Sequence, residues 1–506
     1  MKDYILKRPM LLSGIFCSIV AVLGYYFKIS LLFSAVISVI ALFIMILKEI
    51  KLSYIIAVIM VMIVIISSFF AHGNADTLRD YNEKSDICSF TVTDVTYKSS
   101  GFCSADVEIL ESKILEKGTR LSAYYSSDEL KIGDIVKGEL KLKNINGSDY
   151  RNLYYSKGIY LTASLKKFEI YTDRGDAVLK IIGSIRDYIR KTLFANLRYS
   201  NASTVAALVL GDDSYFTADF NYNIKAAGVS HIMVVSGMHL SLLVLLVTYF
   251  VEKLVYSRYL RAIIMFLTVV FIIAVCGFTA TMLRAGITYY LMAFALLLNR
   301  KSTPDNTLGA AVTVILAAFP FTILSVGFLL SVLATFGILA VALPIIEYIR
   351  CRKLIADKFL FSVISALVIT LSATILTLPV LIHTFGIIST VSLISNLLIT
   401  FMTDIVLWLS VIALALGPIL PMLSKAVFFI CEPLVECVNL TINFFGSLPF
   451  SVLRVPQYLS FAVIAVIILM FYVMLACKKR IDMVKLKEIR KKIISEGGKP
   501  KNGGSF

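Results

Sequence analysis

Histidine and tryptophan are scarce in this chain of 506 residues, which has four of the former and one of the latter. The four histidines, at positions 72, 231, 239 and 383, cannot form a His-x-His-x-Asp-His metal cluster, and the eight cysteines show no zinc-ligand spacing. The chain also lacks a Gly-x-x-x-x-Gly-Lys-Ser/Thr loop. The sequence therefore predicts no metal, no cofactor and no nucleotide-driven motor in this polypeptide.

Apolar residues, by contrast, make up 58% of the chain, against about 45–50% in soluble domains. Apolar runs of roughly 18 residues or more, enough to cross about 30 Å of hydrocarbon, recur almost to the C-terminus. The formal charge of +16 is concentrated in the tail Lys478–Lys501 and beside the first apolar runs. The positive-inside rule places these basic segments in the cytoplasm. We therefore expect a multi-pass membrane protein in contact with lipids.

Residues 1–71 are predicted to form an N-terminal membrane region with three crossings, Met10–Phe27, Ile29–Leu47 and Leu52–Ala71. The first run lacks a small-residue cleavage site, so it is interpreted as a retained anchor rather than a signal peptide. With a cytoplasmic N-terminus, the third crossing ends outside the cell.

Residues 72–175 change character, with charges of both signs, glycine turns and runs of period two. This pattern predicts a small extracellular all-β domain, and an OB-like barrel is favoured over a small sandwich. Five strands are expected: Cys88–Lys98, Cys103–Ile114, Thr119–Tyr125, Ile135–Leu142 and Ile159–Ile170. Cys88 and Cys103 share this region and are candidates for a disulfide if it faces the oxidising side.

Residues 176–200 have apolar positions three or four apart with basic residues between them, which predicts an amphipathic linker helix. Packing on the membrane domain is favoured over DNA binding for this helix. Residues 201–477 are predicted to form a larger polytopic domain with about seven to nine further membrane segments, and residues 478–506 a basic cytoplasmic tail. The fold class is thus a polytopic α-helical membrane protein with an inserted all-β domain.

Several short motifs occur in order along the larger domain. They are Leu-Gly-Asp at 210–212, Gly-Val-Ser-His at 228–231, Ser-Gly-Met-His at 236–239, Arg-Ala-Gly at 284–286, Gly-Phe-Leu-Leu-Ser at 327–331, Thr-Leu-Pro at 377–379, Phe-Gly at 385–386 and Asn396. This series resembles the ComEC-type competence family, although Leu329 stands where the family usually has Gln. Many members carry a C-terminal metallo-β-lactamase-like domain, and the scarcity of histidine indicates a form without it.

The resemblance implies a channel that passes single-stranded DNA across the cytoplasmic membrane during natural transformation. It also implies a separate cytoplasmic ATPase and a surface DNA receptor as partners, with any nuclease on another polypeptide; the oligomeric state stays open. The alternative is a secondary transporter for a small anionic solute. No enzyme is expected, because Ser236 and His239 lie three residues apart on a helix without an acidic residue to orient the histidine.

Polar residues at membrane depth cost a few kcal/mol unless they are paired or face water, which makes them the candidates for the DNA path. On one continuous helix, His231 and His239 would lie about 80° apart and line one side of a passage. Arg284 suits phosphate oxygens, or it pairs with Asp404 or Glu432. Hydrogen bonding to a neighbouring helix is the alternative for each polar group. The DNA-path candidates are His231, Ser236, Gly237, His239, Arg284 and Ser331, and the residues expected to serve the motifs structurally are Gly211, Asp212, Gly327, Phe328, Pro379 and Asn396.

Overall fold

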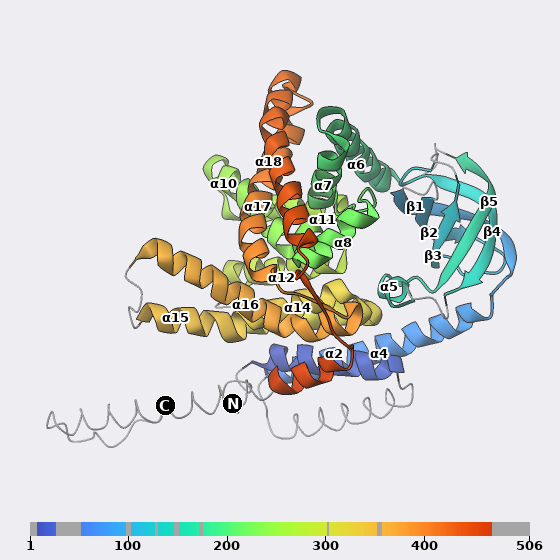
Figure 1. The fold of residues 1–506 in the computed structure, drawn as a ribbon. Helices are drawn as coiled ribbons and strands as arrows, with labels where there is room; N and C mark the ends of the chain where they lie inside the picture. The colour runs from blue at the N-terminus through green and yellow to red at the C-terminus, as the bar shows by residue number, and fades with distance from the viewer. Residues whose placement is uncertain are drawn as a thin grey trace, which may run out of the picture.

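The computed structural model describes residues 8–26, 52–97, 103–126, 130–145, 151–171, 176–300, 303–351 and 357–467. A β-barrel lies to one side of a large body of helices (Figure 1). Among the described residues, eight helices are long and apolar enough to cross a membrane, seven of them after residue 201. This agrees with the prediction of a multi-pass helical protein. The predicted second crossing, Ile29–Leu47, and the basic tail lie outside the described residues.

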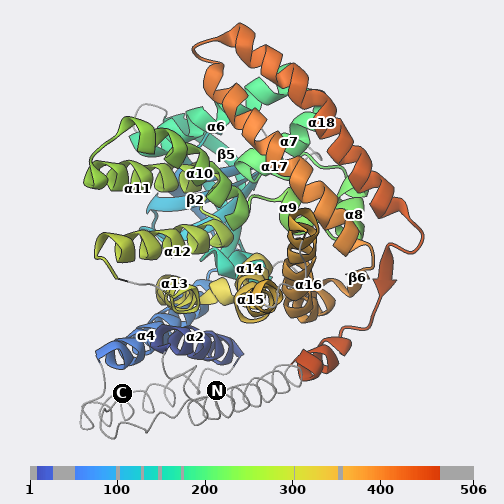
Figure 2. The same cartoon turned by 90° about the vertical axis from the view of Figure 1, so that its left-hand side faces the viewer.

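The two N-terminal helices, α2 (Pro9–Tyr26) and α4 (Leu52–Arg79), run side by side beneath the other helices (Figures 1 and 2). Helix α13 (Pro304–Ala318) packs on both. A Cβ atom added to Gly14 would lie 2.8 Å from the Cα of Gly309, and one added to Gly309 would overlap the backbone of Met10. Small residues allow this close approach of membrane helices. An ion pair between Arg8 and Asp305 holds the same contact.

The all-β region is a closed barrel of five strands, β1 (Ser85–Tyr97), β2 (Cys103–Glu111), β3 (Arg120–Tyr125), β4 (Ile135–Asn144) and β5 (Leu161–Tyr171). The order is β1-β2-β3-β5-β4; β4 closes the barrel on β1 in antiparallel pairing, and β3 and β5 are parallel. All five predicted strands are confirmed, and closure excludes the two-sheet sandwich. Alternate residues of β2 face the interior, as the period of two requires.

The disulfide candidate in the barrel is wrong. Cys103 pairs with Tyr97 at one end of the β1–β2 ladder, whereas Cys88 lies nine residues away along β1 and beside Gly138 of β4. At about 3.3 Å per residue the two Cα atoms are roughly 30 Å apart, and a disulfide needs less than about 7 Å. The expectation rested only on the two cysteines sharing one extramembrane region, and the register of the strands separates the two free thiols.

Asp86, near the start of β1, is buried and accepts several hydrogen bonds from the chain that follows β2. Ser112 Oγ donates at 2.5 Å, Lys113 N at 2.9 Å and Ile114 N at 3.2 Å. Burial acts to raise the pKa of this carboxyl, but the hydrogen bonds outweigh it and hold the pKa below its usual value. Asp86 therefore stabilises the barrel in its ionised form.

A short helix, α5 (Arg151–Ser156), precedes β5 and was not predicted from the sequence. Its Tyr155 is 2% exposed and packs edge-on against Tyr25 of α2 and beside Phe321 of the 3-10 helix η2 (Pro320–Leu324). The guanidinium of Arg151 lies over the rings of Tyr25 and Tyr155. This aromatic cluster fixes the barrel to the membrane helices.

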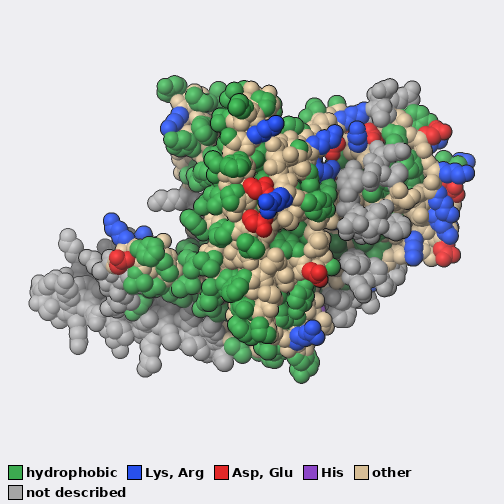
Figure 3. Space-filling model, turned by 45° about the horizontal axis from the view of Figure 1, so that its top comes forward, with side chains coloured by type: hydrophobic (Ala, Val, Ile, Leu, Met, Phe, Trp, Pro, Cys, Tyr) green, Lys and Arg blue, Asp and Glu red, His purple; other side chains and the backbone are tan. Residues whose placement is uncertain are grey.

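The predicted amphipathic helix is α6 (Ala177–Asn196), whose first turn is capped by Asp176 through Val178 N at 2.8 Å. Together with the helices after it, α6 encloses the largest buried hydrophobic cluster among the described residues. Charged side chains gather over the barrel, while the helical body presents a mainly hydrophobic surface (Figure 3).

The remaining elements are α7 (Tyr199–Leu210), α8 (Ala218–Ala227), α9 (Ser230–Met233), α10 (Gly237–Leu254), α11 (Arg258–Val275), α12 (Ala280–Leu297), α14 (Val326–Gly337), the π-helical turn η3 (Ile338–Ala342), α15 (Leu343–Cys351), α16 (Lys358–Phe385), β6 (Ile387–Ser389), α17 (Ser392–Leu416), α18 (Pro421–Ser447) and β7 (Val452–Arg454).

Candidate functional site

The Leu-Gly-Asp motif forms the end of α7, a helix whose residues are almost all buried. Gly211 has φ of 73° and donates its N–H to Ala207 O, so it ends the helix in the left-handed conformation that suits glycine. Asp212 then accepts hydrogen bonds from Ser214 N at 3.2 Å and Ser214 Oγ at 2.5 Å. Its second oxygen lies 3.5 Å from Arg190 of α6. The motif thus shapes a turn and ties it to the linker helix.

The two motifs that contain histidine do not lie on one helix, so the prediction of a continuous helix is wrong. His231 belongs to the short helix α9, and the chain is extended at Val234 and Ser236 before α10 begins at Gly237. His231 is exposed, whereas His239 is fully buried. Serine at the N-cap favours this break. We call the segment from Val234 to Ser236 the α9–α10 break.

His239 folds back over the start of its own helix. The backbone N–H of Ser236 donates to Nδ1 of His239 at 3.3 Å. The ring is 0% exposed, and its Nε2 has no hydrogen-bond partner among the described residues. Because Nδ1 accepts, the neutral ring carries its proton on Nε2.

Arg284 lies in α12, which packs against both α10 and α14. Its Nε donates to Ser331 Oγ of α14 at 2.9 Å. On the other side, a Cβ atom added to Gly237 would lie 3.1 Å from Nη2 of Arg284 and 3.0 Å from the Cβ of Ala285. The structure therefore brings together the Ser-Gly-Met-His, Arg-Ala-Gly and Gly-Phe-Leu-Leu-Ser motifs.

The predicted acidic partners of Arg284 are elsewhere. Glu432 of α18 accepts from Asn201 Nδ2 at 2.9 Å and from Arg198 N at 3.3 Å. Asp404 is on α17, and among the described residues no ion pair joins it to Arg284. The prediction that Arg284 pairs with either carboxylate is therefore wrong for this conformation, and its Nε donates instead to the neutral hydroxyl of Ser331.

The other motif residues make no hydrogen bond to the side chain of Arg284 within the described part of the chain. Gly327 and Phe328 form the first turn of α14. Phe328 is 1% exposed and packs in the hydrophobic cluster that α14 shares with α2 and α13. Pro379 is buried inside α16, and Asn396 is buried in α17 with no hydrogen-bond partner for Oδ1 among the described residues. The structure does not bring these two to Arg284.

The aromatic residues near the start of the larger domain pack among themselves. Phe216 is buried and meets Phe220 edge-on at 5.1 Å between ring centres. The ammonium of Lys225 lies over the ring of Phe385 at 5.6 Å. Ring packing accounts for these contacts.

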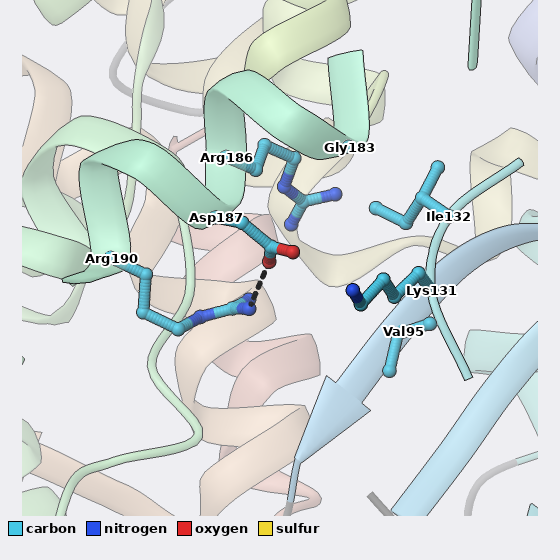
Figure 4. Close-up of a pocket in the computed structure, with 7 residues that line it drawn as sticks. All are labelled: Val95, Lys131, Ile132, Gly183, Arg186, Asp187 and Arg190. Carbon is cyan, nitrogen blue, oxygen red and sulfur yellow. Dashed lines mark hydrogen bonds and ion pairs between the residues drawn. The ribbon is translucent and has the colours of Figure 1, made fainter. Parts of the chain in front are cut away.

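A junction between the barrel and the larger domain was missed in the sequence. Arg186 of α6, 6% exposed, donates to Asp94 of β1 at 2.7 Å, and Gly277 of the α11–α12 turn lies against this pair. Figure 4 shows the neighbouring cleft, where Arg186, Asp187 and Arg190 of α6 face Lys131, Ile132 and Val95 of the barrel. Arg186 is four residues after Ile182 and three before Ile189, so the helical period already placed it on the apolar face.

Within the part of the chain that the structure describes, no group of three or more His, Cys, Asp or Glu side chains is arranged to hold a metal ion. The convergence of a serine, an arginine and a histidine at the α9–α10 break offers hydrogen-bond donors and one permanent positive charge. Hydrogen-bond donors beside a fixed positive charge are groups that suit an anion.

Comparison with known proteins bears on the part of the chain that contains these motifs. Neither a search of curated proteins nor one of solved structures gave a match. A family model described as "Competence protein" matches residues 208–480, from the end of α7 past the last described helix. The match spans more than half of the chain and includes every motif of the larger domain. The protein therefore belongs to the competence protein family.

Proposed function

We propose that this protein conducts one strand of DNA across the cytoplasmic membrane during natural transformation. Membership of the competence protein family supports a role in DNA uptake. The structural observation that best supports a channel is the α9–α10 break. It interrupts a body of apolar helices and gathers Ser236, His239, Arg284 and Ser331 around one point. Irregular backbone at membrane depth is tolerated where it is buried in protein or lines a water-filled path.

In this proposal the barrel is an OB-like module on the outer face of the membrane. Its strand order and the parallel β3–β5 pair support an OB-like arrangement. With the N-terminus and basic tail in the cytoplasm, an odd number of crossings before β1 would place the barrel outside. There it would guide a strand toward the helical body, to which α5 and Arg186 attach it.

The chain supplies the passage, and other polypeptides supply the rest. A surface receptor would deliver DNA, a cytoplasmic ATPase would pull the strand, and a separate nuclease would remove the other strand. We propose no catalytic role for this protein. His239 contacts the backbone N–H of Ser236 rather than its hydroxyl, so the pair lacks the contact of a nucleophile with its base.

The test is uptake of labelled DNA into a nuclease-protected pool in a competent host, with a deletion strain and variants at equal membrane abundance. Deletion is expected to abolish protected DNA while surface-bound DNA stays unchanged. Arg284→Ala and His239→Ala should lower the protected pool. Arg258→Ala, which removes an exposed arginine that contacts the hydroxyl and ring of the neighbouring Tyr259, is the matched control and should have no effect. Intact protected uptake in the deletion strain would refute the channel.

A further inference from the structure

The guanidinium of Arg284 is a buried charge without a counter-ion. The residue is 7% exposed, and the one hydrogen bond of its side chain among the described residues goes from Nε to the neutral hydroxyl of Ser331. The Nη groups therefore have no acceptor within the described part of the chain. Arginine at membrane depth is costly by several kcal/mol unless an anion or water compensates it.

The N-terminus of α10 raises the free-energy cost of this buried cation further. Nη2 lies against Gly237, the first residue of α10, an 18-residue helix. The first N–H groups of a helix lack partners inside it and carry the positive end of the helix dipole. A cation at this end is repelled, whereas an anion there would be attracted by both the helix and the guanidinium.

A second hydrogen-bond donor near the N-terminus of α10, Nε2 of His239, also has no acceptor among the described residues. The ring of His239 is fully buried, and Nε2, the nitrogen that carries the proton in the neutral ring, has no partner among the described residues. Buried donors are nearly always satisfied in native proteins, so an orphan at this position points to a ligand. The two observations concern different side chains and different helices.

We propose that Arg284, the N-terminus of α10 and His239 form a binding site for one oxyanion, and that its occupant is a phosphodiester of the transported strand. A phosphodiester offers two non-bridging oxygens with one negative charge, which the two Nη groups can contact together. A Cβ atom at position 237 would lie 3.1 Å from Nη2 of Arg284, so glycine is the residue that leaves this nitrogen uncovered on the side of α10. This assignment rests on the proposed function. It adds a binding site along the path of the strand, one that recognises the charge of the DNA backbone and does not discriminate between bases.

The test uses the purified full-length protein in nanodiscs of phosphatidylcholine alone, so that no anionic lipid headgroup competes. Binding of a fluorescein-labelled oligothymidylate is measured by anisotropy, with inorganic phosphate and an uncharged methylphosphonate oligothymidylate as competitors. Arg284→Gln is expected to weaken binding by roughly 10-fold or more, as for loss of a charge-assisted contact. The methylphosphonate strand should not compete.

Two further variants separate binding from folding. Arg258→Gln removes the same charge from an exposed position on α11 and should leave binding within about twofold. Gly237→Ala keeps Arg284 but fills its approach, and it should weaken binding as well. Thermal unfolding should not be lowered by Arg284→Gln, because the change removes an uncompensated charge.

Two results would refute the proposal that Arg284 belongs to an oxyanion site. One is equal binding by the Arg284→Gln and Arg258→Gln proteins, and the other is competition by the uncharged strand. Saturation by inorganic phosphate without any binding of oligothymidylate would overturn the phosphodiester as occupant. None of these results changes the effect of deletion on DNA uptake. The binding experiment therefore tests the oxyanion site, and the deletion strain tests the channel, independently of each other.

Discussion

The ion pair between Asp94 and Arg186 should control how firmly the barrel is docked on the linker helix. Asp94→Asn removes the carboxylate and leaves the side chain of Arg186, which is 8% exposed, without this anion. Breaking a buried pair costs about 3–5 kcal/mol. The side chain of Asp94 is 30% exposed, so water offsets part of that, and about 2 kcal/mol is expected.

A cost of about 2 kcal/mol corresponds to roughly 30-fold in the equilibrium for local opening. Hydrogen exchange of the full-length protein measures this directly, as the loss of amide protection in β1 and in the middle of α6. Glu108→Gln is the control, because its pair with Arg120 joins two largely exposed side chains at 3.5 Å and should change protection less than about fivefold. Equal changes in the two variants, or no loss in α6, would refute the assignment of Arg186–Asp94 as the docking contact.

Three further outcomes follow from the packing of the chain. Gly309→Ala should push α2 from α13 and lower the abundance of protein in the membrane, whereas Gly73→Ala, with no atom within 4 Å of the added carbon, should not; immunoblots of membranes compare them. The lowered pKa of Asp86 gives stability that is complete above the ordinary value of about 3.9 and is lost as pH falls below it through the folded-state pKa. Pulse proteolysis in urea should therefore show the barrel weakening with acid in wild type but less so in Asp86→Asn. Mass spectrometry of the unreduced, digested protein should find no peptide linking Cys88 to Cys103, and finding one would contradict the strand register.

The sequence predicted the barrel well because each strand is a local pattern. Alternation of apolar and polar residues along β2, bounded by glycine turns, contains all the information that its place in the barrel needs. The same local reasoning found α6 and its cap at Asp176.

The candidate site was predicted less well, because its geometry depends on contacts between distant segments. The run Ile232–Val235 is as apolar as a helix interior, so the α9–α10 break left no signal in hydropathy. The partner of Arg284 is 47 residues away on α14, and that of Arg186 is 92 residues away on β1. Spacing along one element cannot reveal such pairs, since they exist only once helices from different parts of the chain have packed.

The α9–α10 break has an electrical consequence for the cell. Ile232 and Met233 of α9 and Val235 of the break itself are 1%, 0% and 2% exposed, so apolar side chains are closely packed along this segment. Each elementary charge that leaks across 100 mV dissipates about 2.3 kcal/mol of stored energy. Under the proposed function, a strand must displace these three side chains, and their return restores the insulation of the membrane between uptake events. The segment that admits DNA would thus also be the one that preserves the ion gradient.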